Sequence, residues 1–172
     1  LVSQHPVTTE YGDGERQVTE TLMALQDLKM PTIMLWPNVD AGSEDIARGM
    51  RKFREHYEHG YIRFYKNFSV DTYVRLMKGC ACKIGNSSAA IREGAFLGVP
   101  AVNVGTRQIG RERGANVIDV DYDRGKIIAA IRAQVAHGHY PSEPIYGDGR
   151  AGEHIAEILA TAEFNINKRM TY

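Results

Sequence analysis

The sequence has no excess of charge of either sign and no long apolar run. Its 172 residues include 21 basic and 21 acidic ones, so the formal net charge is zero. A neutral chain lacks the electrostatic signature of a nucleic-acid-binding protein. No apolar run approaches the roughly 20 residues that a transmembrane helix needs. We therefore expect neither nucleic acid nor membrane as a partner, and the lack of a targeting signal predicts a cytoplasmic location.

Cysteine is scarce, and the two that occur are close together, at Cys80 and Cys82. If they lie on a strand, their backbones are roughly 6.5 Å apart and their side chains point the same way, which is poor geometry for a disulfide. No cluster of metal-binding residue types surrounds them, so we expect two small buried thiols and no metal. The sequence also lacks a Walker A loop, a Gly-x-Gly-x-x-Gly motif and a Gly-x-Ser-x-Gly elbow, and we expect no bound cofactor.

Short apolar runs alternate with amphipathic stretches along the whole chain. This pattern predicts one α/β domain over residues 1–172, with a Rossmann-like parallel sheet and helices on both faces. The first residues read as a strand without a preceding Met, which suggests a fragment cut from a longer protein. Strands are expected at 1–4, 32–36, 61–64, 80–84, 101–104 and 116–120. Helices are expected at 14–28, 43–56, 70–77, 88–97, 124–136 and 152–160.

The turn Gly85-Asn86-Ser87-Ser88 follows the fourth expected strand and opens the next expected helix. In open parallel sheets, ligands bind at the carboxyl ends of the strands. Gly85 allows the backbone to come close to a ligand, and Ser87 or Ser88 exposes amides and hydroxyls that suit an anion. An ordinary helix cap has the same sequence, so the turn by itself supports a phosphate site and a simple cap equally.

Three other residues could complete such a site. Glu93 lies on the helix after the turn and could accept from the vicinal hydroxyls of a ribose, although a solvated glutamate would look the same. Arg107 follows the fifth strand, where its planar fork suits phosphate oxygens better than a lysine would. His5 ends the first strand, where it could donate to a phosphate or titrate near neutrality. Each of the three could also be an ordinary structural or surface residue.

Six short motifs occur in one order, and together they resemble the C-terminal domain of hydrolysing UDP-N-acetylglucosamine 2-epimerases. Each motif is weak alone, and the resemblance runs from residue 1 to about 160. The motifs are Gln4-His5-Pro6-Val7-Thr8-Thr9-Glu10, Pro37-Asn38-Val39-Asp40-Ala41-Gly42, Gly85-Asn86-Ser87-Ser88, Ile91-Arg92-Glu93, Gly105-Thr106-Arg107-Gln108 and Tyr146-Gly147-Asp148-Gly149.

The resemblance implies the second of two Rossmann-like domains in a glycosyltransferase-B-type architecture, with a UDP-sugar as ligand. Asn86, Ser87, Ser88, Glu93 and Arg107 would then belong to the UDP site, with the serines at the diphosphate and Glu93 at the ribose. His5 would be a catalytic residue near the diphosphate. The longer protein is expected to be a homo-oligomer related to sialic-acid-pathway enzymes.

The family reaction, as the resemblance implies it, has two steps. A carboxylate removes the proton at carbon 2 while UDP leaves, and water then adds to the glycal to release N-acetylmannosamine or a related sugar. The acid and base carboxylates are expected in the first domain, which this chain lacks. We therefore expect weak UDP binding and no turnover from the chain alone.

Three alternatives stay open on the sequence. A non-hydrolysing epimerase would return an epimeric nucleotide sugar, but those enzymes more often carry an Asp-Ser-Gly-Gly turn. A glycosyltransferase donor domain would also place a glutamate on the ribose, but the His-Pro-Val-Thr-Thr and Gly-Thr-Arg-Gln pieces argue against it. A nucleotide-binding module without chemistry would suit a standalone chain of this length.

Overall fold

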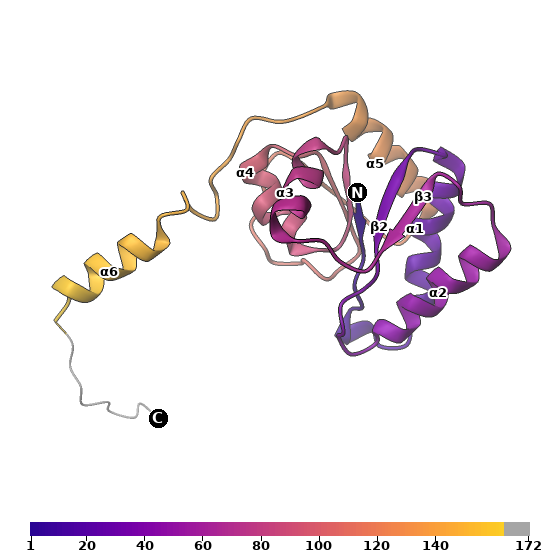
Figure 1. Ribbon diagram of the computed structural model, residues 1–172, viewed down its shortest axis with the longest axis horizontal. Coiled ribbons are helices and arrows are strands. Elements are labelled where there is room, and N and C mark those ends of the chain that lie inside the picture. The colour runs from indigo at the N-terminus through magenta and orange to yellow at the C-terminus, as the bar shows by residue number, and fades with distance from the viewer. Residues whose placement is uncertain (164–172) are drawn as a thin grey trace.

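The computed structural model describes residues 1–163 and contains a six-stranded sheet in which every pairing is parallel (Figure 1). The strand order is β3-β2-β1-β4-β5-β6. All six strands are short, and β5 is buried at each of its four positions. The strands are β1 (Val2–Ser3), β2 (Thr32–Leu35), β3 (Ile62–Tyr65), β4 (Lys83–Gly85), β5 (Ala101–Val104) and β6 (Val117–Val120).

Helices cover both faces of this sheet, which confirms the predicted α/β class. Helices α1, α2 and α5 pack together on one face, whereas α3 and α4 adjoin each other on the opposite face (Figure 1). The helices are α1 (Gly14–Leu28), α2 (Ser43–His56), α3 (Val70–Gly79), α4 (Arg92–Leu97), α5 (Arg124–His137) and α6 (Ala151–Thr161), with 3-10 turns η1 (Thr8–Glu10) and η2 (Ser88–Ala90).

The helix expected at 88–97 is in fact two pieces. The 3-10 turn η2 comes first, and α4 begins only at Arg92. Ser87 caps η2, since its hydroxyl accepts a hydrogen bond from the amide of Ala89 at 3.4 Å. The backbone of η2 then follows the tighter i→i+3 hydrogen-bond pattern of a 3-10 helix. The strand expected at 80–84 likewise begins only at Lys83. No long helix therefore starts directly at the serine turn.

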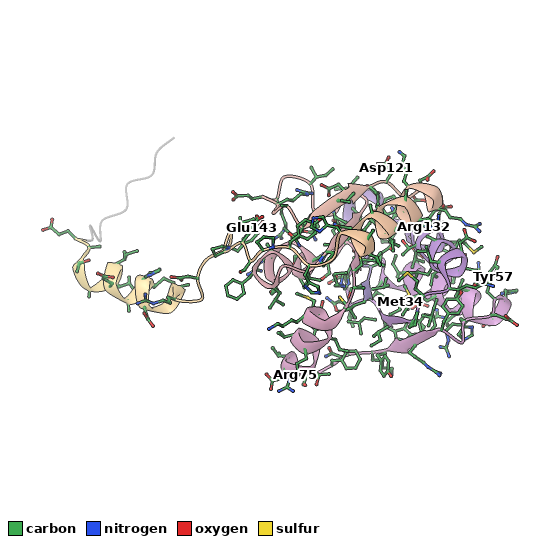
Figure 2. The ribbon with its side chains drawn as sticks, turned by 90° about the horizontal axis from the view of Figure 1, so that it is seen from above. Met34, Tyr57, Arg75, Asp121, Arg132 and Glu143 are labelled. Atoms are coloured by element: carbon green, nitrogen blue, oxygen red, sulfur yellow. The ribbon has the colours of Figure 1, made fainter. Side chains whose placement is uncertain are left out.

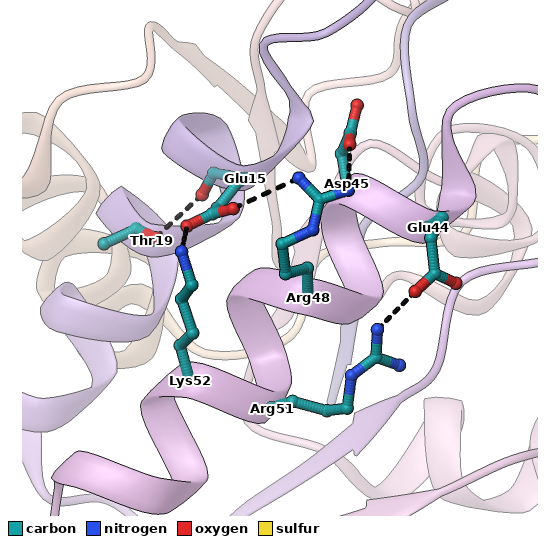
Figure 3. Close-up of polar contacts among 7 residues, drawn as sticks. All are labelled: Glu15, Thr19, Glu44, Asp45, Arg48, Arg51 and Lys52. Atoms are coloured by element: carbon teal, nitrogen blue, oxygen red, sulfur yellow. Dashed lines mark hydrogen bonds and ion pairs between the residues drawn. The ribbon is translucent and has the colours of Figure 1, made fainter.

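The closest helix contact is between α1 and α2, and it depends on a small residue. A Cβ atom at Gly49 of α2 would lie 2.5 Å from a methyl group of Val18 on α1, so only glycine allows the two helices to approach this far. Ion pairs surround this contact on the surface, where Glu15 accepts from Lys52 at 2.5 Å and pairs with Arg48 at 3.5 Å (Figure 3). Exposed pairs of this kind contribute little stability, so burial of apolar side chains holds the helices together.

The last helix, α6, stands apart from the sheet and its helices (Figures 1 and 2). All of its residues are exposed, including Ile155, Ile158 and Leu159 on successive turns. The helix was expected at 152–160 and is observed one residue longer at each end. Across residues 1–163, no helix combines the length and apolar character that crossing a bilayer requires.

The strand order reverses at β1, which lies beside β4 although paired residues such as Val2 and Ile84 are 82 positions apart. The chain moves outward from β1 through β2 to β3 and then returns to the other side of β1. Such a switch point leaves a crevice at the carboxyl ends of the two strands, where ligands bind in open α/β sheets. His5 follows β1 and the turn at Asn86 follows β4, so both flank this crevice.

Glycine is required at the end of β4. Gly85 has φ +114°, and a Cβ atom there would lie 2.1 Å from the carbonyl oxygen of Ser3 on β1. The amide of Asn86 instead donates to that oxygen at 3.1 Å. The close approach of the two strands therefore depends on the absence of a side chain at Gly85.

Candidate functional site

Asn86 holds His5 across the switch point by a pair of hydrogen bonds. The His5 amide donates to Asn86 Oδ1 at 2.7 Å, and Asn86 Nδ2 donates to the His5 carbonyl at 2.8 Å. The Asn86 side chain is completely buried. The resemblance implies that Asn86 belongs to the UDP site, and the structure shows its buried side chain bonded to the backbone of His5.

The His5 ring is a neutral hydrogen-bond donor at neutral pH. Burial lowers its pKa from 6.5 to about 4, with the charges of Arg107 and Lys83 acting in the same direction and Asp40 opposing them. The amide of Asn38 donates to Nδ1 at 3.4 Å, which assigns the ring hydrogen to Nε2. Of the two roles considered from the sequence, donation to a phosphate fits this ring, and titration near neutrality does not.

A cavity of about 740 Å³ opens where the strands end. His5 and Ser3 reach it from β1, and Ser87 reaches it from the turn after β4. Lys66 and Asn67, which follow β3, line the same cavity, together with Tyr73 of α3. The structure thus brings together His5 and Ser87, as the sequence predicted, whereas Ser88 and Arg107 do not line this cavity.

Arg107 lies behind the serine turn and is tied to it. Its Nη1 donates to the carbonyl of Asn86 at 3.2 Å, and Gln108 Nε2 donates to the same oxygen at 2.7 Å. On its other side, Arg107 Nη2 lies 3.9 Å from the carboxylate of Asp40, which follows β2. The guanidinium therefore lies among the ends of β2, β4 and β5. The Arg107 side chain is about a third exposed. Gln108 was not singled out from the sequence, although it belongs to the Gly-Thr-Arg-Gln motif.

Glu93 lies in an adjoining cavity of about 380 Å³ and not in the first one. Tyr73 of α3 lines the first cavity, and its neighbour Val74 lines the second. Burial raises the pKa of Tyr73, the hydroxyls of Ser3 and Ser87 lower it, and the charge of Glu93 raises it. Tyr73 is therefore near both the serine turn and Glu93. Sequence reasoning missed Tyr73, since an aromatic residue on a helix usually indicates packing.

Among residues 1–163, no group of three or more His, Cys, Asp or Glu side chains is arranged to hold a metal ion. Cys80 and Cys82 are free thiols, with Cys82 buried and Cys80 partly exposed. Burial raises the pKa of Cys82 to about 12, so this thiol stays protonated and is a poor nucleophile.

A parallel sheet with helices on both faces and a crevice at its switch point defines a Rossmann-like domain. Solved structures with a similar fold include UDP-N-acetylglucosamine 2-epimerases. One, from Methanocaldococcus jannaschii in complex with UDP-GlcNAc and UDP, has a TM-score of 0.69 at 14% identity and covers 94% of this chain and 45% of its own. The MnaA–UDP structure from S. aureus has a TM-score of 0.62 at 13% identity, covering 92% and 43%.

The particular family follows from sequence comparison. The UDP-N-acetylglucosamine 2-epimerase family model matches residues 1–160, and the chain belongs to this family. A UDP-N-acetylglucosamine 2-epimerase of Neisseria meningitidis serogroup B is 32% identical over 162 residues, which is 92% of this chain and 42% of that protein. A hydrolysing UDP-N,N'-diacetylbacillosamine 2-epimerase of Legionella pneumophila is 30% identical over 161 residues, or 94% and 42%. The chain thus spans less than half the length of these relatives.

Proposed function

We propose that this chain is the UDP-binding domain of a hydrolysing UDP-N-acetylglucosamine 2-epimerase. The observation that carries the proposal is the assembly at the switch point, where His5 and Arg107 are both anchored to Asn86 beside the cavity that Ser87 lines. These groups offer neutral and cationic donors to one anion. The hydrolysing relative from L. pneumophila supports this branch of the family.

The diphosphate is assigned to the serine turn. Ser87 and Ser88 offer hydroxyls and amides, His5 offers Nε2–H, and Arg107 offers a charged fork from behind the turn. Because η2 is a single 3-10 turn and α4 has only six residues, the helix dipole adds less than the sequence suggested. Direct hydrogen bonds and the Arg107 charge therefore account for most of the anion affinity.

The nucleoside is assigned to the adjoining cavity. Glu93 would accept from both ribose hydroxyls, and no protein partner competes for its carboxylate among the hydrogen bonds of residues 1–163. Tyr73 lines the first cavity and lies near Glu93, so its ring offers a stacking surface for the base. Glu93 lies away from the first cavity, which keeps its charge from the diphosphate.

The reaction that this site would assist is elimination of UDP from carbon 1 as the proton leaves carbon 2, followed by addition of water to the glycal. Negative charge grows on the diphosphate as the carbon–oxygen bond breaks. Donors already placed around it stabilise that charge, and removing one such donor typically costs about 10²–10³ in rate. The carboxylates that move protons are assigned to the part of the longer protein outside this chain.

Calorimetric titration with UDP tests the site. Arg107→Ala should weaken binding about 10-fold to 100-fold, because a charged hydrogen bond contributes about 1.5–3 kcal/mol. Arg75→Ala is the matched control, since Arg75 lines a cavity with Thr32, Cys80 and Cys82, away from the serine turn. Equal affinities for the two variants would count against the assigned site.

The hydrolysing outcome is tested on a longer protein that includes the remaining length of the family. Incubation with UDP-N-acetylglucosamine should yield free UDP and a free 2-epimeric sugar in equal amounts. Recovery of an epimeric nucleotide sugar would identify the non-hydrolysing branch instead. Transfer of the sugar to an acceptor would identify a glycosyltransferase.

A further inference from the structure

Lys83 is a completely buried lysine directly beneath the proposed diphosphate cavity. It lies on β4, and none of its side chain is exposed. Its Nζ donates to Ser3 Oγ at 2.7 Å, and Ser3 is one of the residues that line the cavity. Among residues 1–163, Lys83 forms no ion pair with a carboxylate within 4 Å. A buried amine without a counter-ion is costly to charge.

The groups around Lys83 do not compensate for its charge. Burial is the main influence and lowers its pKa from 10.5 to about 7, with Cys80 and Cys82 acting weakly in the opposite direction. Burial keeps the Cys82 thiol protonated. Three other titratable groups lie near Lys83 and Ser3. They are the amino terminus of Leu1, the His5 ring that follows β1, and the Tyr73 phenol on α3. At neutral pH, Lys83 is therefore close to the balance between amine and ammonium.

The protonation state of Lys83 controls the direction of the Ser3 hydroxyl. An ammonium group has three donors and no acceptor, so Ser3 Oγ must accept from it and turn its own hydrogen elsewhere. A neutral amine has a free lone pair, so the Ser3 hydrogen can instead point inward to Nζ. The side of Ser3 away from Lys83 faces the cavity and the Tyr73 phenol, whose pKa the Ser3 hydroxyl lowers.

We propose that Lys83 is a positioning residue of the UDP site, which takes up one proton when a diphosphate enters the cavity and thereby turns the Ser3 hydroxyl toward the anion. This inference rests on the proposed function. A bound diphosphate supplies the negative charge that the pocket lacks, and it favours the ammonium form. By reciprocity, the protonated lysine binds the diphosphate more tightly than the neutral one.

The test follows the Lys83 side chain directly. Lysine ¹⁵Nζ and ¹³Cε resonances of the chain are titrated from pH 5.5 to 10, alone and with saturating UDP. The Lys83 signal is identified as the one that is missing from the spectrum of Lys83→Met. Side-chain correlation spectra of the parent chain assign the same signal independently, so the experiment does not depend on the variant folding. Free Lys83 should titrate near pH 7, and bound UDP should move the midpoint upward by at least one pH unit.

UDP calorimetry at pH 8 and pH 9 gives a second measurement. The terminal phosphate, with a pKa near 6, is fully ionised in this range, and His5, with its pKa of about 4, is far from its midpoint. From pH 8 to pH 9, one-proton linkage weakens affinity by about 1.5-fold to 2-fold if the bound midpoint is near pH 8, and by up to about tenfold if that midpoint is higher. Lys83→Met should remove this slope, whereas His5→Gln should retain it.

The outcomes separate this inference from the proposed function. Tight UDP binding that leaves the Lys83 midpoint unchanged overturns the inference and leaves the UDP site intact. If UDP does not bind, saturating inorganic pyrophosphate is used instead. In that case, an upward shift with pyrophosphate supports the lysine role and rejects the nucleotide site, whereas no shift with pyrophosphate rejects both.

Discussion

His5 and Asn86 exchange two hydrogen bonds across the gap between β1 and β4, at 2.7 and 2.8 Å. They are 81 residues apart in the sequence, and the asparagine side chain replaces the backbone pairing that the sheet can no longer provide beyond the strand ends. The carbonyl of the same Asn86 accepts from Arg107 and Gln108. One buried side chain and its backbone thus organise three of the loops that surround the crevice.

Removal of the Asn86 side chain should affect stability and binding together. Asn86→Ala leaves the buried amide and carbonyl of His5 without partners, which should cost about 2–4 kcal/mol in the free energy of unfolding. UDP affinity should also fall, although the side chain lies beneath the site. Urea denaturation and calorimetry measure the two effects. Asn67→Ala is the stability control, because Asn67 is exposed and bonds only to the next amide. Equal stability of both variants would contradict the anchoring role.

The buried neutral imidazole of His5 predicts a pH dependence of stability. Its folded pKa of about 4 lies below the ordinary value of 6.5, so between these two pH values the unfolded chain binds more protons than the folded one. Stability should therefore rise from pH 4 to pH 6.5, by up to about 3 kcal/mol from this residue alone. His5→Gln should flatten that part of the curve in urea denaturation. If the stability of His5→Gln rises with pH as steeply as that of the parent chain, other groups cause the pH dependence.

The close approach of Gly85 to the backbone of Ser3 at the end of β4 predicts that no other residue is tolerated at position 85. Gly85→Ala would place a methyl group 2.1 Å from the Ser3 carbonyl oxygen at a left-handed φ, and we expect a loss of about 3 kcal/mol or more. Gly79→Ala is the matched control, because nothing lies within 4 Å of its added Cβ and its φ is ordinary. Thermal melts of the two variants decide the point, and a mild effect at Gly85 would refute the close approach.

The assignment of Glu93 to the ribose predicts discrimination between sugars. The parent chain should bind UDP about 10-fold to 100-fold more tightly than 2'-deoxy-UDP, as expected for a hydrogen bond to a charged acceptor. Glu93→Ala should weaken UDP binding and remove most of that preference. Glu55→Ala, which removes an exposed glutamate on α2 away from both cavities, should keep it. If Glu93→Ala still prefers UDP over 2'-deoxy-UDP as strongly as the parent chain does, Glu93 does not bind the ribose.

Much of this protein is determined by its sequence alone. Helices α1 and α2 have the bounds that periodicity predicts, because amphipathic spacing and a flanking glycine or proline are local signals. The alternation of strands and helices leads to a parallel sheet, and the family follows from six motifs in order. The turn at Gly85 is also readable, since its position after a buried strand is a property of the chain.

The tertiary structure decides which of these residues meet and what they can do. The sequence groups Asn86 with the UDP-site residues, and only the fold shows that its side chain is buried and bonded to the His5 backbone. The charge states of His5 and Lys83 depend on burial and on neighbours far away in the sequence, such as Arg107 for His5, so no local pattern reveals them. Tyr73 looks like a packing residue until the fold places it in the cavity, near the serine turn and Glu93. Burial and long-range contacts are properties of the folded chain, and they determine which polar residues come together in the candidate site and which of them are charged.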